Sequence, residues 1–366
     1  MKIALLGAGH IGQTIARLLH ASGDYQLTVI DRDPSALARL AGEGIATRVV
    51  DTEDSTALLA ELRRGGQQTV VNALPYQLAV ATASVALEAG CHYFDLTEDV
   101  AATQAIKRLA EGAATAFMPQ CGLAPGFIGI VAHHLAQRFE TLHDVKMRVG
   151  ALPAFPTNAL KYNLTWSVDG LINEYCHPCE AIRDGEKLDV LPLEGLEHFS
   201  LDGTEYEAFN TSGGLGTLCD TLAGRVRTLD YKSVRYPGHQ AVMKLLLEDL
   251  RLKDDQANLK AILRKSVPGT MQDVVLVFVT VSGLRDGQLV QEVFARKIFA
   301  DRTEGAALSA IQITTAAGIC AAVDLFREGW LPASGFIRQE QIELPTFLAN
   351  RFGSAYQQSR QVESIS

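Results

Sequence analysis

A glycine-rich motif lies at the start of the chain. Gly7-Ala-Gly9-His10-Ile11-Gly12 has the spacing G-x-G-x-x-G, and it separates a short apolar run from a helical pattern. In that context the first glycine permits a tight turn, the second leaves room for a pyrophosphate, and the third lets the helix pack closely. The helix N-terminus also offers free N–H groups to phosphates. The sequence therefore predicts that a dinucleotide is bound by Gly7, Gly9, His10, Ile11 and Gly12.

Acidic and small residues follow the next strands of the same region. Asp31 ends the second predicted strand, where an acid accepts hydrogen bonds from ribose hydroxyls and repels a 2′-phosphate. This favours NAD, although Arg32 is compatible with NADP. Asn72, Ala73 and Pro75 end the fourth predicted strand and are candidate contacts on the nicotinamide side. Asn72 and Pro75 are equally typical of ordinary strand termini.

Candidate substrate residues lie where polar side chains interrupt apolar stretches. Asp95 and Glu98 follow the strand predicted at 92–95, at the sheet edge where ligands bind. The alternative is capping of the next helix, which suits Thr97 and Asp99 better than Asp95.

Two later segments carry further candidates. Lys161 and Tyr162 lie in a mixed polar and aromatic stretch, and Lys161 is either a surface charge or a desolvated acid–base group. Arg235 and His239 flank a Pro-Gly turn. The arginine fork suits a carboxylate, with a plain surface loop as the alternative.

The cysteines indicate neither a disulfide framework nor a metal site. Six are present in 366 residues, which is few for that length, and reduced thiols are expected. Cys176 and Cys179 form a single C-x-x-C without two further ligands at suitable spacing, so no metal is predicted.

The elements that position these residues follow two patterns. Strands alternate with helices at the start, which predicts an α/β fold with a doubly wound parallel Rossmann sheet. The predicted strands are 2–6, 25–30, 47–50, 69–72, 92–95 and 116–120. A mixed α+β domain follows, with strands predicted at 145–152, 274–282 and 289–299 and helices at 128–139 and 240–249. We expect a Rossmann domain at 1–122, a substrate-binding and dimerisation domain at 123–302, and C-terminal helices at 303–366 packing back on the Rossmann domain.

Composition excludes some partners. The net charge of -9 disfavours nucleic acid and anionic lipid. The longest uncharged stretch, Ala306–Val323, contains several polar residues, so a buried helix is expected and not a membrane span. The N-terminus lacks the pattern of a signal peptide, which predicts a cytoplasmic protein.

Several motifs together resemble the saccharopine dehydrogenase-like family. They are the GAGHIG motif, the loop Cys121–Phe127, the run Asn158–Gly170, the run Glu174–Cys179, the loop Thr211–Gly216 and the segment Arg235–His239. The resemblance covers nearly the whole chain, and its middle segments are more specific than the Rossmann part. It implies an NAD(P)-dependent enzyme, a homodimer, and chemistry at a C–N bond of an amino acid.

Within the family, the likeness is to the branch that deaminates the ε-amine of L-lysine. That reaction yields 2-aminoadipate 6-semialdehyde, which cyclises, and ammonia. It requires a proton acceptor, for which Lys161 or Asp95 is expected, with Glu98 holding an ammonium and Arg235 the carboxylate. Tyr162, Thr211 and His239 would orient the substrate. The alternatives are a saccharopine- or carboxynorspermidine-type secondary-amine dehydrogenase and a non-catalytic dinucleotide sensor.

Overall fold

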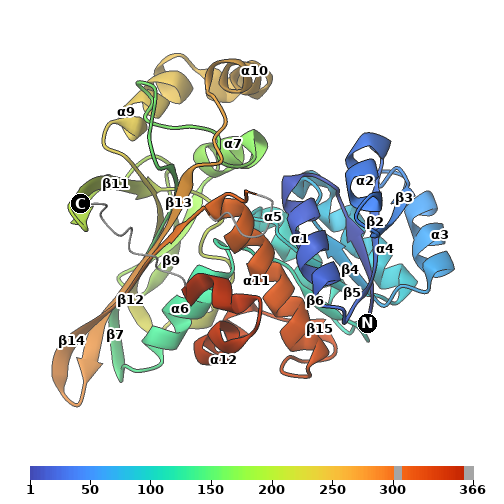
Figure 1. Ribbon diagram of the computed structural model, residues 1–366. Coiled ribbons are helices and arrows are strands. Elements are labelled where there is room, and N and C mark those ends of the chain that lie inside the picture. The colour runs from blue at the N-terminus through green and yellow to red at the C-terminus, as the bar shows by residue number, and fades with distance from the viewer. Residues whose placement is uncertain (301–306, 358–366) are drawn as a thin grey trace, which may run out of the picture. The chain divides into compact units, whose positions relative to one another are not determined.

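The computed structural model describes residues 1–300 and 307–357. Their contacts divide the chain into two compact units. Unit 1 comprises Met1–Ile130 and Thr314–Ala355, and unit 2 comprises Val131–Ile313 with the residues from Tyr356. Each unit has its own sheet (Figure 1).

Unit 1 contains a parallel sheet of seven strands in the order β15-β6-β5-β4-β1-β2-β3. Its strands are β1 (Lys2–Leu6), β2 (Gln26–Asp31), β3 (Ala46–Val49), β4 (Thr69–Asn72), β5 (His92–Asp95), β6 (Ala116–Met118) and β15 (Gly335–Phe336). The order reverses between β1 and β4, which is the switch point where Rossmann folds bind dinucleotides. This arrangement agrees with the predicted doubly wound sheet.

Helices connect these strands and flank the sheet (Figure 1). They are α1 (His10–Ala21), α2 (Pro34–Ala41), α3 (Ser55–Gly65), α4 (Ala79–Ala89) after the short η1 (Tyr76–Leu78), and α5 (Val100–Leu109). The next helix, α6 (Phe127–Ala136), begins in unit 1 and ends in unit 2. Asp33, Asp54 and Asp99 cap α2, α3 and α5 by accepting hydrogen bonds from backbone amides of the first turn. All four residues of β4 are buried, as expected for a strand covered on both faces.

The C-terminal part of unit 1 returns to the Rossmann sheet. β15 pairs in parallel with β6 at the edge of the sheet. The buried carboxylate of Asp324, on α11 (Ala310–Arg327), accepts hydrogen bonds from Tyr25 at 2.5 Å and from Arg351 at 2.7 Å. Although burial opposes it, these donors together lower the pKa of Asp324 to about 2. The remaining C-terminal elements are η4 (Gln339–Gln341), α12 (Leu344–Ala349) and η5 (Gly353–Gln357).

Helix α11 is the one helix in the described part of the chain that has the length and hydropathy of a membrane span. However, 78% of that stretch is buried inside the protein. A core helix of small residues has the same composition, which agrees with the expectation from its serine, threonine and glycine residues.

Unit 2 contains a mixed sheet whose main path is β10-β11-β12-β7-β13-β14. Its strands are β7 (Thr141–Pro153), β8 (Cys179–Arg183), β9 (Glu186–Val190), β10 (Glu197–Leu201), β11 (Thr204–Asn210), β12 (Val226–Arg235), β13 (Asp273–Arg285) and β14 (Gln288–Phe299). β12 pairs with β7 in parallel, and the other neighbours on this path are antiparallel. The three strands predicted here are present, each longer than predicted at one or both ends.

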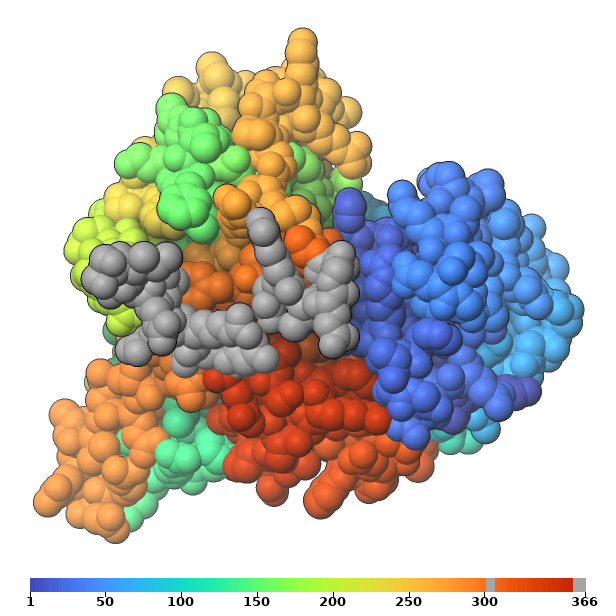
Figure 2. All heavy atoms as spheres, viewed as in Figure 1, coloured from blue at the N-terminus to red at the C-terminus, as the bar shows by residue number. Residues whose placement is uncertain are grey.

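The hairpin between β13 and β14 turns later than predicted. The expected turn was Gly283–Gly287, but Gly283 is paired within β13 and the turn consists of Asp286 and Gly287 alone. Both turn residues have positive φ, 53° and 72°, as a two-residue Asp-Gly turn requires. In the space-filling view the orange tip of this hairpin stands out at the surface (Figure 2).

The helices of unit 2 differ most from the predictions. The predicted helix 240–249 is α9 (His239–Lys244) followed by a π-turn, η2 (Leu245–Asp249), and by η3 (Leu252–Asp254). Helices α7 (Val168–Cys176), α8 (Leu218–Leu222) and α10 (Gln256–Ser266) lie in stretches without a predicted helix. Tyr162, Tyr175 and Phe209 belong to the apolar core that α7, α9 and α10 share. This core holds the aromatic side chains described next.

Candidate functional site

The glycine loop between β1 and α1 has the geometry of a phosphate cradle. A Cβ on Gly7, whose φ is +99°, would lie 2.9 Å from the carbonyl oxygen of Ala73, and a Cβ on Gly12 would lie 2.0 Å from that of Gly7. Next to Gly9, by contrast, there is open space. No side chain caps the N-terminus of α1, which begins at exposed His10 and half-buried Ile11. The loop therefore fits a pyrophosphate at a free helix N-terminus.

Asp31 lies beside this loop at the end of β2. Its carboxylate accepts hydrogen bonds from the amide of Ala8 at 2.6 Å and from that of Asp33 at 2.8 Å. The side chain of Arg32 is exposed and forms a 2.7 Å ion pair with Glu53. Asp31 is thus placed as the ribose contact of a Rossmann fold would be, and Arg32 already has an anionic partner.

The turn after β4 supports the glycine loop. Asn72 is buried, donates to the hydroxyl of Tyr93 at 3.0 Å and accepts from the amide of Leu74. Ala73 bonds to Leu6, and Pro75 precedes η1. The side chain of Asn72 therefore acts as a strand terminator, the alternative considered for it, while the turn carries Ala73 toward Gly7.

Asp95 is buried and its carboxylate is fully engaged. It accepts hydrogen bonds from the amides of Thr97 at 3.0 Å and Gln120 at 2.9 Å, and it contacts the hydroxyl of Tyr93 at 2.9 Å. Burial raises its pKa to about 6 against these donors. The geometry is that of a carboxylate joining the ends of β5 and β6, and it leaves no oxygen exposed for proton transfer to a substrate.

Glu98, three residues on, is different. Asp99 caps α5 and Thr97 accepts from the amide of Asp99, but the half-buried carboxylate of Glu98 receives no hydrogen bond from another described residue. Burial raises the pKa of Glu98 to about 7, and the negative charges of Asp99 and Asp95 act in the same direction. A carboxyl group that titrates near neutrality at the ligand-binding edge of a sheet is a candidate proton acceptor.

Unit 2 places Arg235 at the end of β12 in a cluster of aromatic side chains. The side chain is 2% exposed, and its guanidinium carbon lies 5.2 Å from the ring centre of Tyr162 and 5.8 Å from that of Tyr175. Nε donates to the Tyr175 hydroxyl at 2.9 Å, and Nη1 donates to the Val234 carbonyl. Among the described residues, no carboxylate lies within ion-pair distance of Arg235, and the buried carboxylate of Glu174 interacts with it electrostatically from farther away.

His239, at the start of α9, joins the same cluster. Its Nε2 lies 3.0 Å from the Tyr175 hydroxyl, and its Nδ1 lies 2.9 Å from the carbonyl oxygen of Leu160. The buried carboxylate of Glu207 accepts from the amides of Gly238 and Gln240 and so holds the turn that carries His239. Tyr175 and Glu207 were not predicted, since neither stands out in its local sequence.

The remaining candidates lie around this cluster. Tyr162 is buried against His239, with 5.3 Å between ring centres, and its hydroxyl has no hydrogen-bond partner within the described ranges. Thr211 bonds to Ser233 at 2.8 Å. Lys161 is exposed, has a positive φ of 52°, and donates to the Pro237 carbonyl at 2.9 Å. Of the two alternatives left open for Lys161, the structure shows the exposed charge and not the desolvated acid–base group.

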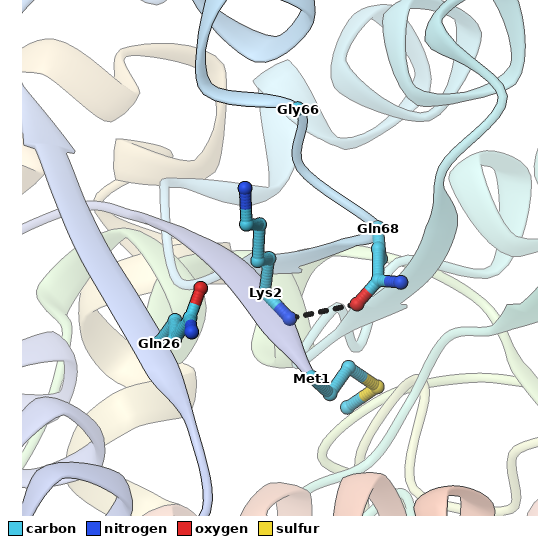
Figure 3. Close-up of a pocket in the computed structure, with 5 residues that line it drawn as sticks. All are labelled: Met1, Lys2, Gln26, Gly66 and Gln68. Atoms are coloured by element: carbon cyan, nitrogen blue, oxygen red, sulfur yellow. Dashed lines mark hydrogen bonds between the residues drawn. The ribbon is translucent and has the colours of Figure 1, made fainter.

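A shallow polar hollow lies at the end of the Rossmann sheet opposite the glycine loop. It is lined by Met1, Lys2, Gln26, Gly66 and Gln68, and the Lys2 amide donates to Gln68 (Figure 3). These residues begin or precede strands whose other ends carry the glycine loop, so the hollow is remote from that loop. Within residues 1–300 and 307–357 no three His, Cys, Asp or Glu side chains are grouped to hold a metal, and all six cysteines are free thiols.

Two family models match this chain. Residues 3–117 match the saccharopine dehydrogenase NADP binding domain, and residues 122–352 match the saccharopine dehydrogenase C-terminal domain. The first match confirms the prediction of a nicotinamide dinucleotide cofactor, and it covers the residues of the glycine loop. The second covers the aromatic cluster around Arg235.

One relative and one solved structure add to this. The mitochondrial alpha-aminoadipic semialdehyde synthase of Rattus norvegicus is 20% identical over 199 residues, which are 52% of this chain and 21% of that protein. The chain thus spans about a fifth of the length of that relative. Apo saccharopine dehydrogenase (L-Glu forming) from Saccharomyces cerevisiae matches with a TM-score of 0.78 and 17% identity, over 94% of this chain and 96% of the other. At this identity the match confirms the predicted fold alone.

Proposed function

Because this chain belongs to the saccharopine dehydrogenase family of NAD(P)-dependent amino-acid oxidoreductases, we propose that it is a lysine 6-dehydrogenase. In this proposal the ε-carbon of L-lysine loses hydride to the nicotinamide, and water hydrolyses the resulting imine to 2-aminoadipate 6-semialdehyde and ammonia. The observation that carries the proposal is which of the buried cations in unit 2 have an ion-pair partner.

Among the described residues of unit 2, three cationic side chains are buried: Arg148, Lys232 and Arg235. Arg148 is paired with Asp230 at 2.6 Å and with Glu197, and Lys232 is paired with Glu197 at 2.8 Å. Arg235 alone of these three has no carboxylate within ion-pair distance among the described residues, and the buried carboxylate of Glu174 acts on it only across a longer distance. Burying a charge without a counterion is costly, so a bound anion is expected to compensate it. One such cation suits the single carboxylate of lysine better than a substrate with additional carboxylates.

The proton acceptor that the geometry favours is Glu98. Asp95 is fully hydrogen-bonded and Lys161 is exposed, whereas Glu98 is half-buried without another donor. A pKa of about 7 leaves a large fraction of Glu98 ionised at neutral pH, when it can take a proton from the substrate ammonium. This role replaces the passive ammonium contact expected from the sequence.

The cofactor supplies the redox chemistry, since a bound nicotinamide accepts hydride from the carbon that bears the amine. The chain's own contribution is to hold the pyrophosphate at Gly9 and the ribose at Asp31. Asp31 would repel a 2′-phosphate, and Arg32 is engaged by Glu53, so we propose NAD as the preferred cofactor. A homodimer and a cytoplasmic location also belong to this proposal, on the resemblance and the composition.

The proposal is tested with the purified chain by following absorbance of the reduced nicotinamide. L-lysine, saccharopine, carboxynorspermidine, ornithine and glutamate are offered in turn with NAD and with NADP. We expect reduction with L-lysine and NAD together with release of ammonia. Turnover confined to a secondary amine would assign the saccharopine or polyamine type of reaction. Tight cofactor binding without turnover of any of these substrates would instead favour a dinucleotide sensor.

Glu98→Gln provides a second prediction. The wild-type enzyme should lose kcat/KM as pH falls through about 7, because protonated Glu98 cannot accept a proton. The glutamine variant should lack that limb and turn over at least ~100-fold more slowly, as expected when a general base is removed. Exposed Glu111→Gln is the matched control. An unchanged pH profile in Glu98→Gln would exclude this role.

The same variant has a readout that is independent of activity. A carboxyl group whose folded pKa is raised to about 7 binds its proton more tightly in the folded state, so its contribution to stability falls as pH rises from its unfolded value toward 7. Glu98→Gln should therefore unfold at a higher temperature than wild type at pH 8, and the difference should shrink at pH 5.

A further inference from the structure

We infer that Tyr175 and His239 form a directional hydrogen-bond chain that orients the guanidinium of Arg235 for a carboxylate. The inference rests on the proposed function, since it concerns the same anion site. It assigns both residues as positioning residues that act through Arg235. His239 was expected to contact the substrate, and Tyr175 was not expected to take part.

The direction of the chain follows from counting protons. A carbonyl oxygen only accepts, so Nδ1 of His239 carries a proton and donates it to Leu160 at 2.9 Å. In a neutral imidazole Nε2 is then an acceptor, and it receives the hydroxyl proton of Tyr175 at 3.0 Å. The Tyr175 oxygen in turn accepts from Nε of Arg235 at 2.9 Å. Each donor has one acceptor, and the order cannot be reversed.

The surroundings keep His239 neutral. It is 0% exposed, and its ring stacks on Phe209 and lies against Tyr162 and Tyr175. Burial lowers the pKa of His239 to about 3, and the nearby charge of Arg235 adds to the effect. The tautomer with a proton on Nδ1 therefore persists throughout the physiological pH range.

The hydrogen-bond chain leaves Nη2 of Arg235 available to a carboxylate. Nε is occupied by Tyr175 and Nη1 by the Val234 carbonyl, whereas Nη2 donates to no described residue. The two tyrosine rings limit rotation of the guanidinium plane. With Nε fixed by Tyr175, Nη2 points in a defined direction, which lowers the ordering cost of binding a carboxylate.

Tyr175→Phe is the decisive variant, because it removes the hydroxyl and keeps the ring. We expect the KM for L-lysine to rise about 10-fold, as for loss of one hydrogen bond to a charged group, with kcat within a factor of about 2. Inhibition by L-norleucine, which has the carboxylate and lacks the ε-amine, should weaken by the same factor. Tyr236→Phe is the matched control, since its hydroxyl donates to Pro153 and not to the Arg235 cluster.

The hydrogen-bond chain also predicts NMR signals that can be measured without turnover. In protein labelled with ¹⁵N-histidine and ¹⁵N-arginine, His239 should show a protonated Nδ1 and an unprotonated Nε2 at pH 7. The Nε–H of Arg235 should exchange slowly in wild type and faster in Tyr175→Phe. His239→Gln, which retains a donor and an acceptor, should bind L-norleucine more tightly than His239→Phe does.

The outcomes separate the two proposals. If wild type does not oxidise lysine but shows the predicted tautomer and the protected Arg235 Nε–H, the proposed substrate fails and the hydrogen-bond chain stands. If wild type oxidises lysine but Tyr175→Phe leaves KM, L-norleucine inhibition and Arg235 exchange unchanged, the chain is overturned. A protonated Nε2 on His239 would overturn it as well.

Discussion

Arg235→Gln is expected to lower kcat/KM for L-lysine by a factor of about 10³, since removing one partner from a buried charge pair costs roughly 2–5 kcal/mol. The guanidinium is enclosed by Tyr162 and Tyr175, so a glutamine leaves the substrate carboxylate in a pocket without a counterion. Steady-state kinetics with NAD as the second substrate measure the effect. The Kd for NAD should be unchanged, because the cofactor loop lies in the other unit.

Two further variants make this result interpretable. Arg235→Lys keeps the charge but loses the donation to Tyr175 and the planar fork, so it should recover only part of the activity. Arg225→Gln removes an exposed arginine from the same unit and should have no effect. If Arg235→Gln folded normally and retained near-normal kcat/KM for lysine, Arg235 would not be the carboxylate site.

The geometry of the candidate cofactor site could be predicted from the sequence because its signals are local. Three glycines within six residues, an acid at the end of the next strand and the strand–helix alternation all reflect neighbours in the chain. The structure places Gly7, Gly12 and Asp31 in the contacts that these rules assume. The same local reasoning located β7, β13 and β14, whose alternating patterns are long and clear.

The surroundings of the candidate substrate residues could be predicted only in part, because they depend on contacts between distant segments. Arg235 draws attention as a cation beside a Pro-Gly turn, but its environment comes from Tyr175, 60 positions earlier in the chain. Lys161 has the residue type of an acid–base group, yet a backbone turn with positive φ leaves it exposed. Asp95 and Glu98 look alike in the sequence, and the contacts that the Asp95 carboxylate makes with the amides of Thr97 and Gln120 and with the hydroxyl of Tyr93 distinguish them.

The second large effect is expected on NAD affinity, from a matched pair of glycine-to-alanine substitutions in the glycine loop. Gly9 has φ -68° and ψ -174°, which alanine adopts without strain, and open space surrounds its Cβ position. Gly9→Ala should therefore leave the unfolding temperature unchanged. Its methyl group occupies the space of the pyrophosphate, so the Kd for NAD should rise at least ~100-fold, equivalent to losing two hydrogen bonds to a charged group.

Gly12→Ala should behave differently, because the added Cβ would lie 2.0 Å from the carbonyl oxygen of Gly7. The loop and α1 must separate, which is expected to cost about 1–3 kcal/mol of stability in addition to cofactor affinity. Thermal unfolding without NAD, followed by calorimetric titration with NAD, resolves both quantities. Equal destabilisation by the two variants would mean that the space beside Gly9 is needed for folding. Unchanged NAD affinity in Gly9→Ala would place the pyrophosphate elsewhere.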